Sequence, residues 1–207
     1  MIISANLILV IITCIVSFVC FSNQTYFNKG AHNPYLEHHR GEKYRLLTSG
    51  FLHADHFHLF INMFVLYQFG AVLEDVFVQR YGNLGSYIYF VFYLVMIVLA
   101  NLYTHFKYQD VPSYRAIGAS GATSAVLFAY IYYYPLSMLG LYMVIPVPAI
   151  VFGVLYLWYS SWASKKNMDN IGHDAHLYGA LAGFLTSVIL DLGQMKTFIN
   201  TILGVFQ

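Results

Sequence analysis

The stretch "RAIGASGATSAVLFAYI", residues 115–131, joins a short polar loop to a run of apolar residues. Gly118 and Gly121 flank Ser120 at the point where the loop gives way to that run. The apolar run predicts a membrane helix, with Ser120 at or just before its first residue. A serine in this place has two interpretations. It caps the helix by accepting a backbone N–H, or it lies beside free N–H groups and a positive dipole end that suit an oxyanion.

The composition of the chain predicts an integral membrane protein. Of its 207 residues, 59% are hydrophobic and only 9% are charged, whereas an ordinary soluble domain carries about 25% charged residues. The formal net charge is +1, and no basic stripe is interleaved with aromatics, so we expect no nucleic-acid partner. The first apolar segment has no basic region before it and no cleavage site after it. We therefore expect a retained membrane helix rather than a signal peptide, and no mitochondrial leader.

Six apolar segments predict an all-α integral membrane protein, a bundle of six transmembrane helices in a single domain over residues 1–207. Residues 22–56 form a long polar first loop, which we expect to be an ordered insertion because long loops are uncommon unless functional. Residues 194–207 predict a short amphipathic piece at the surface. The predicted helices cover residues 2–21, 57–77, 85–105, 118–134, 137–160 and 174–192.

The basic residues bear on orientation. Most of the 10 Lys and Arg residues fall in the first, third and fifth predicted loops. The positive-inside rule would therefore place these loops in the cytoplasm. A long ordered loop need not obey that rule, so the charge count leaves the orientation open.

The stretch "HDAHLYGALAGF", residues 173–184, carries a histidine at the start of the sixth predicted helix. Gly179 and Gly183 follow His176 on the same side of that helix and form a G-x-x-x-G pair, which lets helices pack closely in lipid. Packing against the small residues after Ser120 would bring His176 within hydrogen-bond reach of Ser120. A serine beside a histidine is the nucleophile and base pair of acyl transfer. Alternatively, His176 only satisfies a helix end.

The stretch "HADHFHLFINMF", residues 53–64, places His58 and Asn62 four residues apart on one face of the second predicted helix. Both side chains can donate hydrogen bonds, and such donors in a water-poor site would stabilise a developing oxyanion. The alternative is ordinary hydrogen bonding between helices.

The histidines also raise a metal hypothesis. A zinc metalloprotease would pair its histidines with a glutamate base, but no H-E-x-x-H motif occurs in the chain. We therefore favour the serine hypothesis and expect neither a metal nor another cofactor. The candidate ligands of the metal hypothesis are His53, His56 and His58, with His173 and His176 beside them.

Taken in chain order, these motifs resemble the rhomboid family of intramembrane serine proteases. The resemblance spans almost the whole chain and includes the six helices and the long first loop. Each motif is weak singly, but three in order at appropriate helix positions are a specific signal. The matching elements are "HLFIN", "GASG" and "AHLYGALAG", with "GEKYR" in the first loop and "YQFGAVLE", which ends at Glu74, as further similar stretches.

The resemblance implies that Ser120 is the nucleophile and that His176 is the general base and later the general acid. His58, Asn62 and the backbone N–H of Ser120 would form the oxyanion hole. The partners would be the lipid bilayer and single-span membrane proteins, cut in or near their transmembrane segments. The resemblance also implies a cytoplasmic N-terminus and an active site that opens to the extracytoplasmic side, and we expect a plasma membrane location.

The chain departs from the family's pattern near the expected catalytic pair. Asp174 lies two positions from His176, where a helix would point it elsewhere, so we expect a Ser–His dyad rather than a triad. Many family members carry an aromatic residue one turn after the nucleophile, and this chain has Ser124 there. His173 is an additional histidine, which we expect to face water. The alternatives are a non-catalytic rhomboid-like protein that binds membrane clients and a histidine-rich metal-dependent membrane protein.

Overall fold

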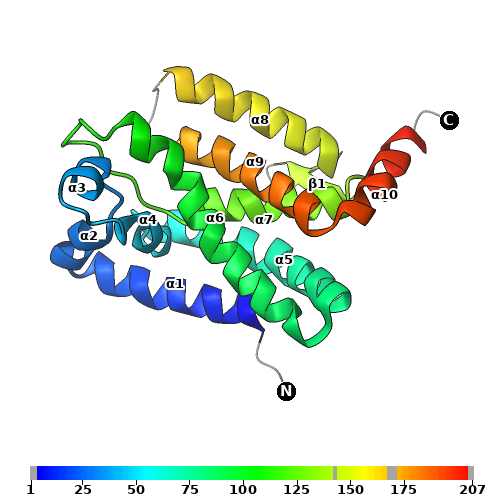
Figure 1. The fold of residues 1–207 in the computed structure, drawn as a ribbon, viewed down its shortest axis with the longest axis horizontal. Coiled ribbons are helices and arrows are strands. Elements are labelled where there is room, and N and C mark those ends of the chain that lie inside the picture. Colours follow the sequence, from blue (N-terminus) through cyan, green and yellow to red (C-terminus); the bar gives the residue numbers. More distant parts are fainter. Residues whose placement is uncertain (1–3, 142–143, 167–171, 205–207) are drawn as a thin grey trace.

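Helices dominate the computed structural model, which describes residues 4–141, 144–166 and 172–204. Figure 1 shows the helix α1 along one side, α8 along the other, and short helices of the first loop gathered at one end. In chain order the elements are α1 (Ala5–Phe21), α2 (Gln24–Gly30), α3 (Pro34–His39), α4 (Arg45–Thr48), η1 (Ser49–Phe51), α5 (His56–Tyr81), η2 (Gly82–Leu84), α6 (Gly85–Lys107), α7 (Ser120–Tyr133), β1 (Met138–Leu141), β2 (Ile145–Pro148), α8 (Ala149–Lys166), α9 (His173–Leu190) and α10 (Leu192–Leu203).

The helix α7 forms the centre of the bundle. Nearly all of its residues are buried, and it packs against α5, α6 and α9. Small side chains on its first turns allow this close packing, as the sequence predicted. Helices also occur at four further predicted segments, as α1, α5, α6 and α9, with bounds that differ from the predictions by at most four residues.

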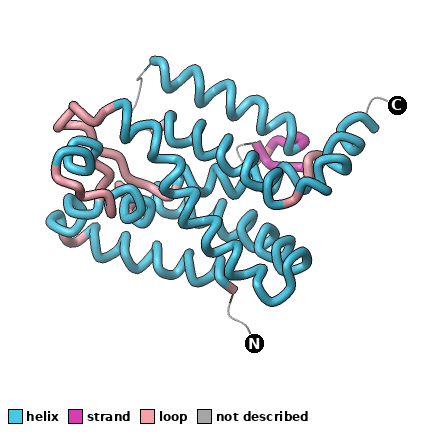
Figure 2. The backbone as a smooth tube through the Cα atoms, viewed as in Figure 1, coloured by secondary structure: helices cyan, strands magenta, loops and turns pink. Residues whose placement is uncertain are grey.

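The predicted helix over residues 137–160 is wrong in its first half. Strands β1 and β2 form an antiparallel hairpin there, with Met138 opposite Pro148, and Figure 2 shows it between the helices. Pro146 and Pro148 lack a backbone N–H and disfavour the helical conformation of the residue before them. The helix therefore begins only after the second proline, at Ala149.

The C-terminal segment agrees with its prediction. α10 (Leu192–Leu203) has no buried residue among those the structure describes. Asp191 caps its first turn by accepting a hydrogen bond from the N–H of Gln194 at 3.2 Å. α10 is bent by 114° relative to α9. It is therefore an amphipathic helix at the surface of the bundle.

The lengths of the helices do not settle how many of them cross a membrane. In the described parts of the chain, one helical stretch is long and apolar enough, His56–Lys107, which contains α5 and α6; the bent pair α9 and α10 would be a second. The apolar helix α1 has 17 residues and α7 has 14. The expected number of six spans is therefore not established by the helices themselves.

The first loop is an ordered insertion, as predicted. The guanidinium of Arg45, in the "GEKYR" stretch, donates hydrogen bonds to the carbonyls of Asn28 at 2.7 Å and Ala31 at 3.0 Å. It also forms an ion pair with Glu42 at 2.6 Å. Arg45 is only 5% exposed. Its buried hydrogen bonds connect α4, which carries it, to the end of α2.

Glu74 on α5 holds the start of α1. Its carboxylate accepts hydrogen bonds from the backbone N–H groups of Ala5 at 2.8 Å and Asn6 at 3.0 Å, and from the Ser4 hydroxyl at 2.5 Å. A carboxylate there satisfies free N–H groups and complements the positive end of the helix dipole. In the sequence, Glu74 stands out only through the family resemblance. In the structure it lies on α5 and caps the first turn of α1.

Candidate active site

Ser120 is the first residue of α7, and it is not the helix cap. The N-cap position belongs to Ala119, and no side-chain cap bond is present among the described residues of this turn. The N-cap interpretation of Ser120 is therefore wrong. Gly118 has φ +123°, and a Cβ on it would stand 3.0 Å from Nε2 of His58 and 3.5 Å from Oγ of Ser120. Only glycine fits between these two side chains without strain.

The hydrogen bonds of His58 define which ring nitrogen carries the proton. The Asp55 carboxylate caps α5 by accepting from the His58 backbone N–H at 2.8 Å. The N–H of Ala54 donates to Nδ1 of the His58 ring at 3.4 Å. Because Nδ1 accepts, Nε2 is the protonated nitrogen of the neutral ring. That N–H is on the side of the ring that faces Gly118.

Asn62 follows His58 by one turn and is 4% exposed. Its Nδ2 donates to the His58 carbonyl at 2.9 Å, and its Oδ1 accepts from the Thr123 hydroxyl at 3.2 Å. An amide carries two N–H donors, so one bond to a carbonyl leaves a second N–H for another acceptor. The bond to Thr123 fixes the Asn62 side chain against α7.

The glycines of α9 lie directly on the backbone of α7. A Cβ on Gly179 would stand 2.1 Å from the carbonyl oxygen of Gly121, and one on Gly183 would stand 2.1 Å from that of Ala125. A Cβ on Gly121 would in turn lie 3.3 Å from the carbonyl oxygen of Ala175. The predicted close packing is therefore confirmed. This packing places Gly121, which follows Ser120, against Ala175, which precedes His176.

One cavity of about 1000 Å³ opens between α5, α7, α8 and α9. Its size is at the upper end of the range for ligand pockets. The structure therefore brings together four side chains from three helices that are far apart in the sequence. The predicted site residues that line this cavity are His58, Asn62, Ser120 and His176.

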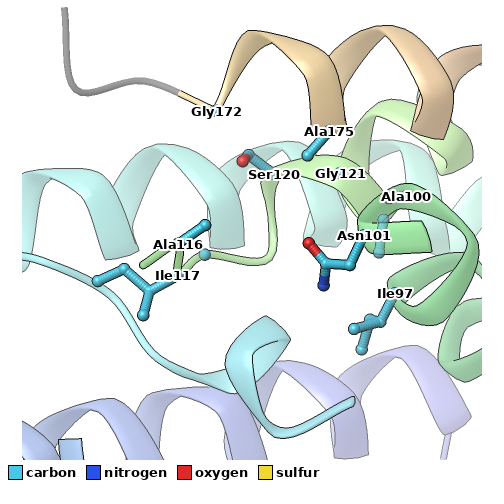
Figure 3. A pocket seen from close by; sticks show the side chains of 11 residues that line it. Ile97, Ala100, Asn101, Ala116, Ile117, Ser120, Gly121, Gly172 and Ala175 are labelled. Atoms are coloured by element: carbon cyan, nitrogen blue, oxygen red, sulfur yellow. The ribbon is translucent and has the colours of Figure 1, made fainter. Parts of the chain in front are cut away.

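A second, much smaller cavity of about 20 Å³ also borders Ser120 and is lined in addition by residues of α6. Figure 3 shows it between Ser120 and Asn101, with the Asn101 amide oxygen directed to the side where Ser120 lies. Such a volume holds one water molecule. The Asn101 Nδ2 is occupied elsewhere, because it donates to the Leu46 carbonyl at 3.1 Å and the Ser49 hydroxyl at 3.2 Å.

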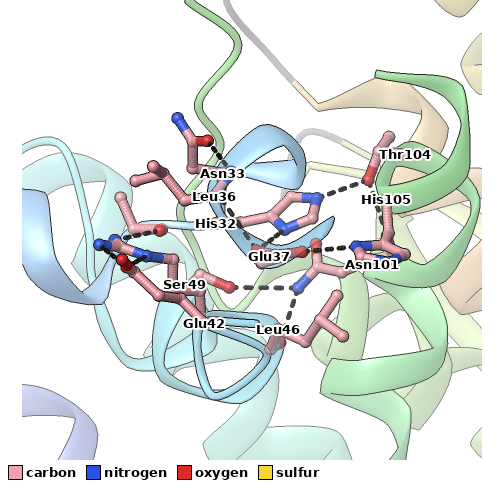
Figure 4. Close-up of polar contacts among 12 residues, drawn as sticks. His32, Asn33, Leu36, Glu37, Glu42, Leu46, Ser49, Asn101, Thr104 and His105 are labelled. Atoms are coloured by element: carbon pink, nitrogen blue, oxygen red, sulfur yellow. Dashed lines mark hydrogen bonds and ion pairs between the residues drawn. The ribbon is translucent and has the colours of Figure 1, made fainter. Parts of the chain in front are cut away.

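The first loop is fixed to α6 beside this small cavity by a buried carboxylate. Figure 4 shows Glu37 between two histidine rings. It accepts from Nδ1 of His32 at 2.6 Å and from Nδ1 of His105 at 2.8 Å. Burial raises the pKa of Glu37, but the hydrogen bond and charge of His32, with the hydrogen bonds from His105 and the Asn33 N–H, together outweigh burial, and the net pKa is lowered. The carboxylate is thus held ionised in a fully buried place.

His53, which the sequence offered only as a metal ligand, holds the backbone next to Ser120. The N–H of Ala119 donates to its Nε2 at 3.3 Å, and its Nδ1 lies 2.9 Å from the Ser17 hydroxyl, which donates to the Phe51 carbonyl. Both ring nitrogens are therefore bonded within the protein. Burial, with a smaller effect of nearby His58, lowers the pKa of His53 to about 3. Among the described residues, no group of three or more His, Cys, Asp or Glu is arranged to hold a metal ion.

Of two residues near His176, Asp174 is bonded to other side chains, as predicted, whereas His173 does not face water. The Asp174 carboxylate is bonded to Nζ of Lys107 at 2.9 Å and to the Ser164 hydroxyl. The expectation that His173 faces water is wrong, because it is 5% exposed. Its ring packs against Tyr159 of α8 at 5.6 Å and against His176 at 5.9 Å. The helix α8 covers this side of α9, which an isolated helix pattern does not reveal.

The fold and the site define a helical membrane-type bundle with a serine at the start of its central helix and histidines around it. The chain belongs to the rhomboid family, whose Rhomboid domain model matches residues 40–192. It is 29% identical to RHOMBOID-like protein 12, mitochondrial, of Arabidopsis thaliana over 164 residues, which cover 75% of this chain and 49% of that protein. It is 30% identical to Rhomboid-like protein 11, chloroplastic, of the same plant over 180 residues, 79% of this chain and 58% of that protein.

The chain thus spans about half the length of the curated relatives it matches. Rhomboid proteins are embedded in membranes, so the membrane class predicted from the composition is confirmed. The expected plasma membrane location gains no support from these relatives, because their names place them in mitochondria and chloroplasts.

Proposed function

We propose that the chain is an intramembrane serine endopeptidase that hydrolyses peptide bonds through a dyad of Ser120 and His176. The observation that carries this proposal is the cavity of about 1000 Å³ lined by both residues together with His58 and Asn62. Family membership supports it, and the stretches "GASG" and "AHLYGALAG", which resemble motifs of that family, contain Ser120 and His176. Neither a metal nor a cofactor is needed for this chemistry.

The first half of the reaction forms an acyl-enzyme. The Oγ of Ser120 attacks the carbonyl carbon of the scissile peptide, and His176 takes the hydroxyl proton. The resulting tetrahedral intermediate collapses when its C–N bond breaks. His176 then gives the proton to the leaving amine, and the acyl group remains on Ser120 as an ester.

The second half consumes one water molecule. His176 removes a proton from the water, whose oxygen attacks the ester carbonyl carbon. The C–O bond to Ser120 breaks, the serine recovers the proton, and a carboxylic acid product leaves. The small cavity of about 20 Å³ beside Ser120 offers space for one such water.

The negative charge on the tetrahedral oxygen needs hydrogen-bond donors. The N–H at Nε2 of His58 borders the same space as Oγ of Ser120, the space that a Cβ on Gly118 would fill. The second N–H of Asn62, on α5, and the backbone N–H of Ser120, at the start of α7, would be further donors. Donors that are already in place cost no reorganisation when the charge develops.

We propose one domain over residues 1–207 that crosses the membrane six times, through α1, α5, α6, α7, α8 and α9. The lipid bilayer and single-span membrane proteins would be its partners. The peptide bonds of an intact membrane helix are hydrogen-bonded, so helix-breaking residues near one end of the substrate's span would favour cleavage. The active site would open to the extracytoplasmic side, and accessibility of tags at residues 30 and 165 would test that orientation.

A second function, binding of membrane clients without cleavage, is favoured by one observation. The relatives are named only as rhomboid-like proteins. A binding protein would keep its function when Ser120 is replaced by alanine, whereas a serine protease would lose it. The two functions therefore differ in whether Ser120 is a reactive nucleophile.

Labelling with a fluorophosphonate tests this difference without a known substrate. The purified chain in detergent would be treated with fluorophosphonate–rhodamine, and the modified residue located by mass spectrometry. The proposed function predicts labelling on Ser120 that Ser120→Ala abolishes and His176→Ala greatly slows. Ser137→Ala, which changes a serine outside the cavity, is the control. Absence of label on Ser120 in the wild-type protein would favour client binding.

A further inference from the structure

One aromatic ring of α8 lies against the histidine of the candidate dyad. The rings of Tyr156 and His176 have centroids 6.3 Å apart and are inclined by 28°. This is the offset-stacked arrangement that aromatic rings prefer, for which centroid separations of about 4.5–7 Å are usual. The α7 residue one turn after Ser120 is Ser124, so α7 itself offers no ring at that position. The ring beside His176 comes from a different helix.

The hydroxyl of the same tyrosine is linked to Ser120 through the hydroxyl of Ser124. The Oη of Tyr156 lies 2.5 Å from Oγ of Ser124, and the Ser124 Oγ lies 2.7 Å from the carbonyl oxygen of Ser120. A serine hydroxyl has a single proton to donate. Both contacts are satisfied when Tyr156 donates to Ser124 and Ser124 donates to the Ser120 carbonyl.

The Tyr156 ring is itself firmly held. It stacks on Phe152 of its own helix with centroids 6.1 Å apart, and it packs on Phe128 of α7 at 5.7 Å. Phe128 is 4% exposed. A ring confined by neighbours on two helices can limit the orientations of the imidazole beside it.

We propose that Tyr156 is a positioning residue for the dyad and replaces an aromatic residue that α7 lacks. Its ring orients the imidazole of His176, and its hydroxyl fixes the first turn of α7 at Ser120 through Ser124. It acts through its contacts with His176 and Ser124. The proposal rests on the proposed function, because it concerns how the same serine and histidine are aligned.

The test separates alignment from folding by measuring two constants for the reaction of Ser120 with fluorophosphonate–rhodamine. The rate constant for bond formation, kinact, reports how well the dyad is aligned, and the inhibition constant KI reports probe binding. Tyr156→Leu removes the ring and should lower kinact about tenfold while KI changes little, given the usual strength of an aromatic pair. Tyr156→Phe keeps the ring and should restore kinact to within about threefold of wild type.

Trp158→Leu is the matched control, because Trp158 is an aromatic of the same helix that is 66% exposed and lies outside the cavity lining. It should leave both constants unchanged. A double-mutant cycle tests the hydroxyl contact even if Tyr156→Leu fails to fold. Adding Tyr156→Phe to Ser124→Ala should slow labelling no further than Ser124→Ala alone, because Ser124→Ala already removes the Tyr156–Ser124 hydrogen bond along with the bond to the Ser120 carbonyl.

Three outcomes would overturn the proposal. Wild-type kinact in folded Tyr156→Leu would show that the ring does not orient His176. Independent, multiplicative effects of Tyr156→Phe and Ser124→Ala would show that the hydroxyls are not coupled. Failure of the wild-type protein to label at Ser120 is a different result, since it would remove the proposed function and this proposal with it.

Discussion

The backbone of Gly179 on α9 lies against the backbone of Gly121 on α7, so closely that a Cβ on Gly179 would stand 2.1 Å from the Gly121 carbonyl oxygen. Backbone atoms at this contact cannot rotate away as the end of a side chain can. The spacing of α7 and α9 therefore depends on glycine. Because Ser120 precedes Gly121 and His176 lies one turn before Gly179, the same contact sets the distance between the two helix starts.

Replacing Gly179 with alanine is expected to force the two helices apart. The cost should be about 1–3 kcal/mol of stability, as for overpacked cores, and labelling of Ser120 should fall with it. The thermal midpoint in detergent and the labelling rate would be measured together. Gly204→Ala is the control, because nothing lies within 4 Å of a Cβ at that position. An unchanged midpoint in Gly179→Ala would show that the helices do not need the close contact.

Removing the imidazole of His58 should weaken the oxyanion site without removing the nucleophile. The rate would be measured by cleavage of a reporter protein that carries one membrane span. We expect His58→Ala to lower this rate by about 10²–10³-fold, the usual effect of losing one such donor. The reporter KM should change little, since the donor acts on the charge that develops during reaction. His38→Ala, at an exposed histidine of the first loop, provides the control. A variant that loses affinity instead of rate would place His58 in substrate binding.

His53 makes folding sensitive to pH. Burial lowers its pKa from 6.5 to about 3, so on acidification the unfolded chain takes up a proton that the folded chain does not. The stabilising contribution is complete above pH 6.5 and is lost progressively as the pH falls toward 3. Between pH 7.5 and 5 the loss should be about 2 kcal/mol. Thermal midpoints over this range should fall less in His53→Gln, which does not titrate; parallel curves would contradict the assignment.

Glu37 is expected to be a structural residue of the first loop. Its carboxylate is fully buried and bonded to the rings of His32 and His105. Glu37→Ala leaves both rings and the Asn33 N–H without this acceptor, which should cost about 3 kcal/mol. Asp110→Ala removes an exposed carboxylate that also faces a histidine, His39, and should cost little. Equal thermal midpoints for the two variants would contradict the role of Glu37.

The helices and their packing were largely predictable, because local composition encodes them. Apolar runs located α1, α5, α6, α7 and α9, and the G-x-x-x-G pair of α9 predicted its contact with α7. The hairpin before α8 was missed because the apolar run continues through Pro146 and Pro148. The apolar composition predicts a helix there, but the two prolines disfavour the helical conformation of the residue before each of them.

The candidate site was predictable only where a motif identified it. Motif order predicts four site residues, and all four line one cavity, while their catalytic roles stay predictions: His58, Asn62, Ser120 and His176. The contribution of Tyr156 was not visible, since "VLYLWYS" does not show which aromatic faces the cavity. The same holds for His53, because its bonds to Ser17 and Ala119 join segments far apart in the chain.

The central claim, that this chain cuts a membrane segment through Ser120 and His176, is tested most directly by cleavage of a reporter. The reporter would be a fluorescent protein with one membrane span that carries glycine and proline near one end, reconstituted with the chain in liposomes. We predict one cut, mapped by mass spectrometry in or beside that span, that disappears in Ser120→Ala and in His176→Ala but persists in Ser137→Ala. Cleavage that survives in both dyad variants, or no cleavage by a protein whose Ser120 does not react with a fluorophosphonate, would contradict the account.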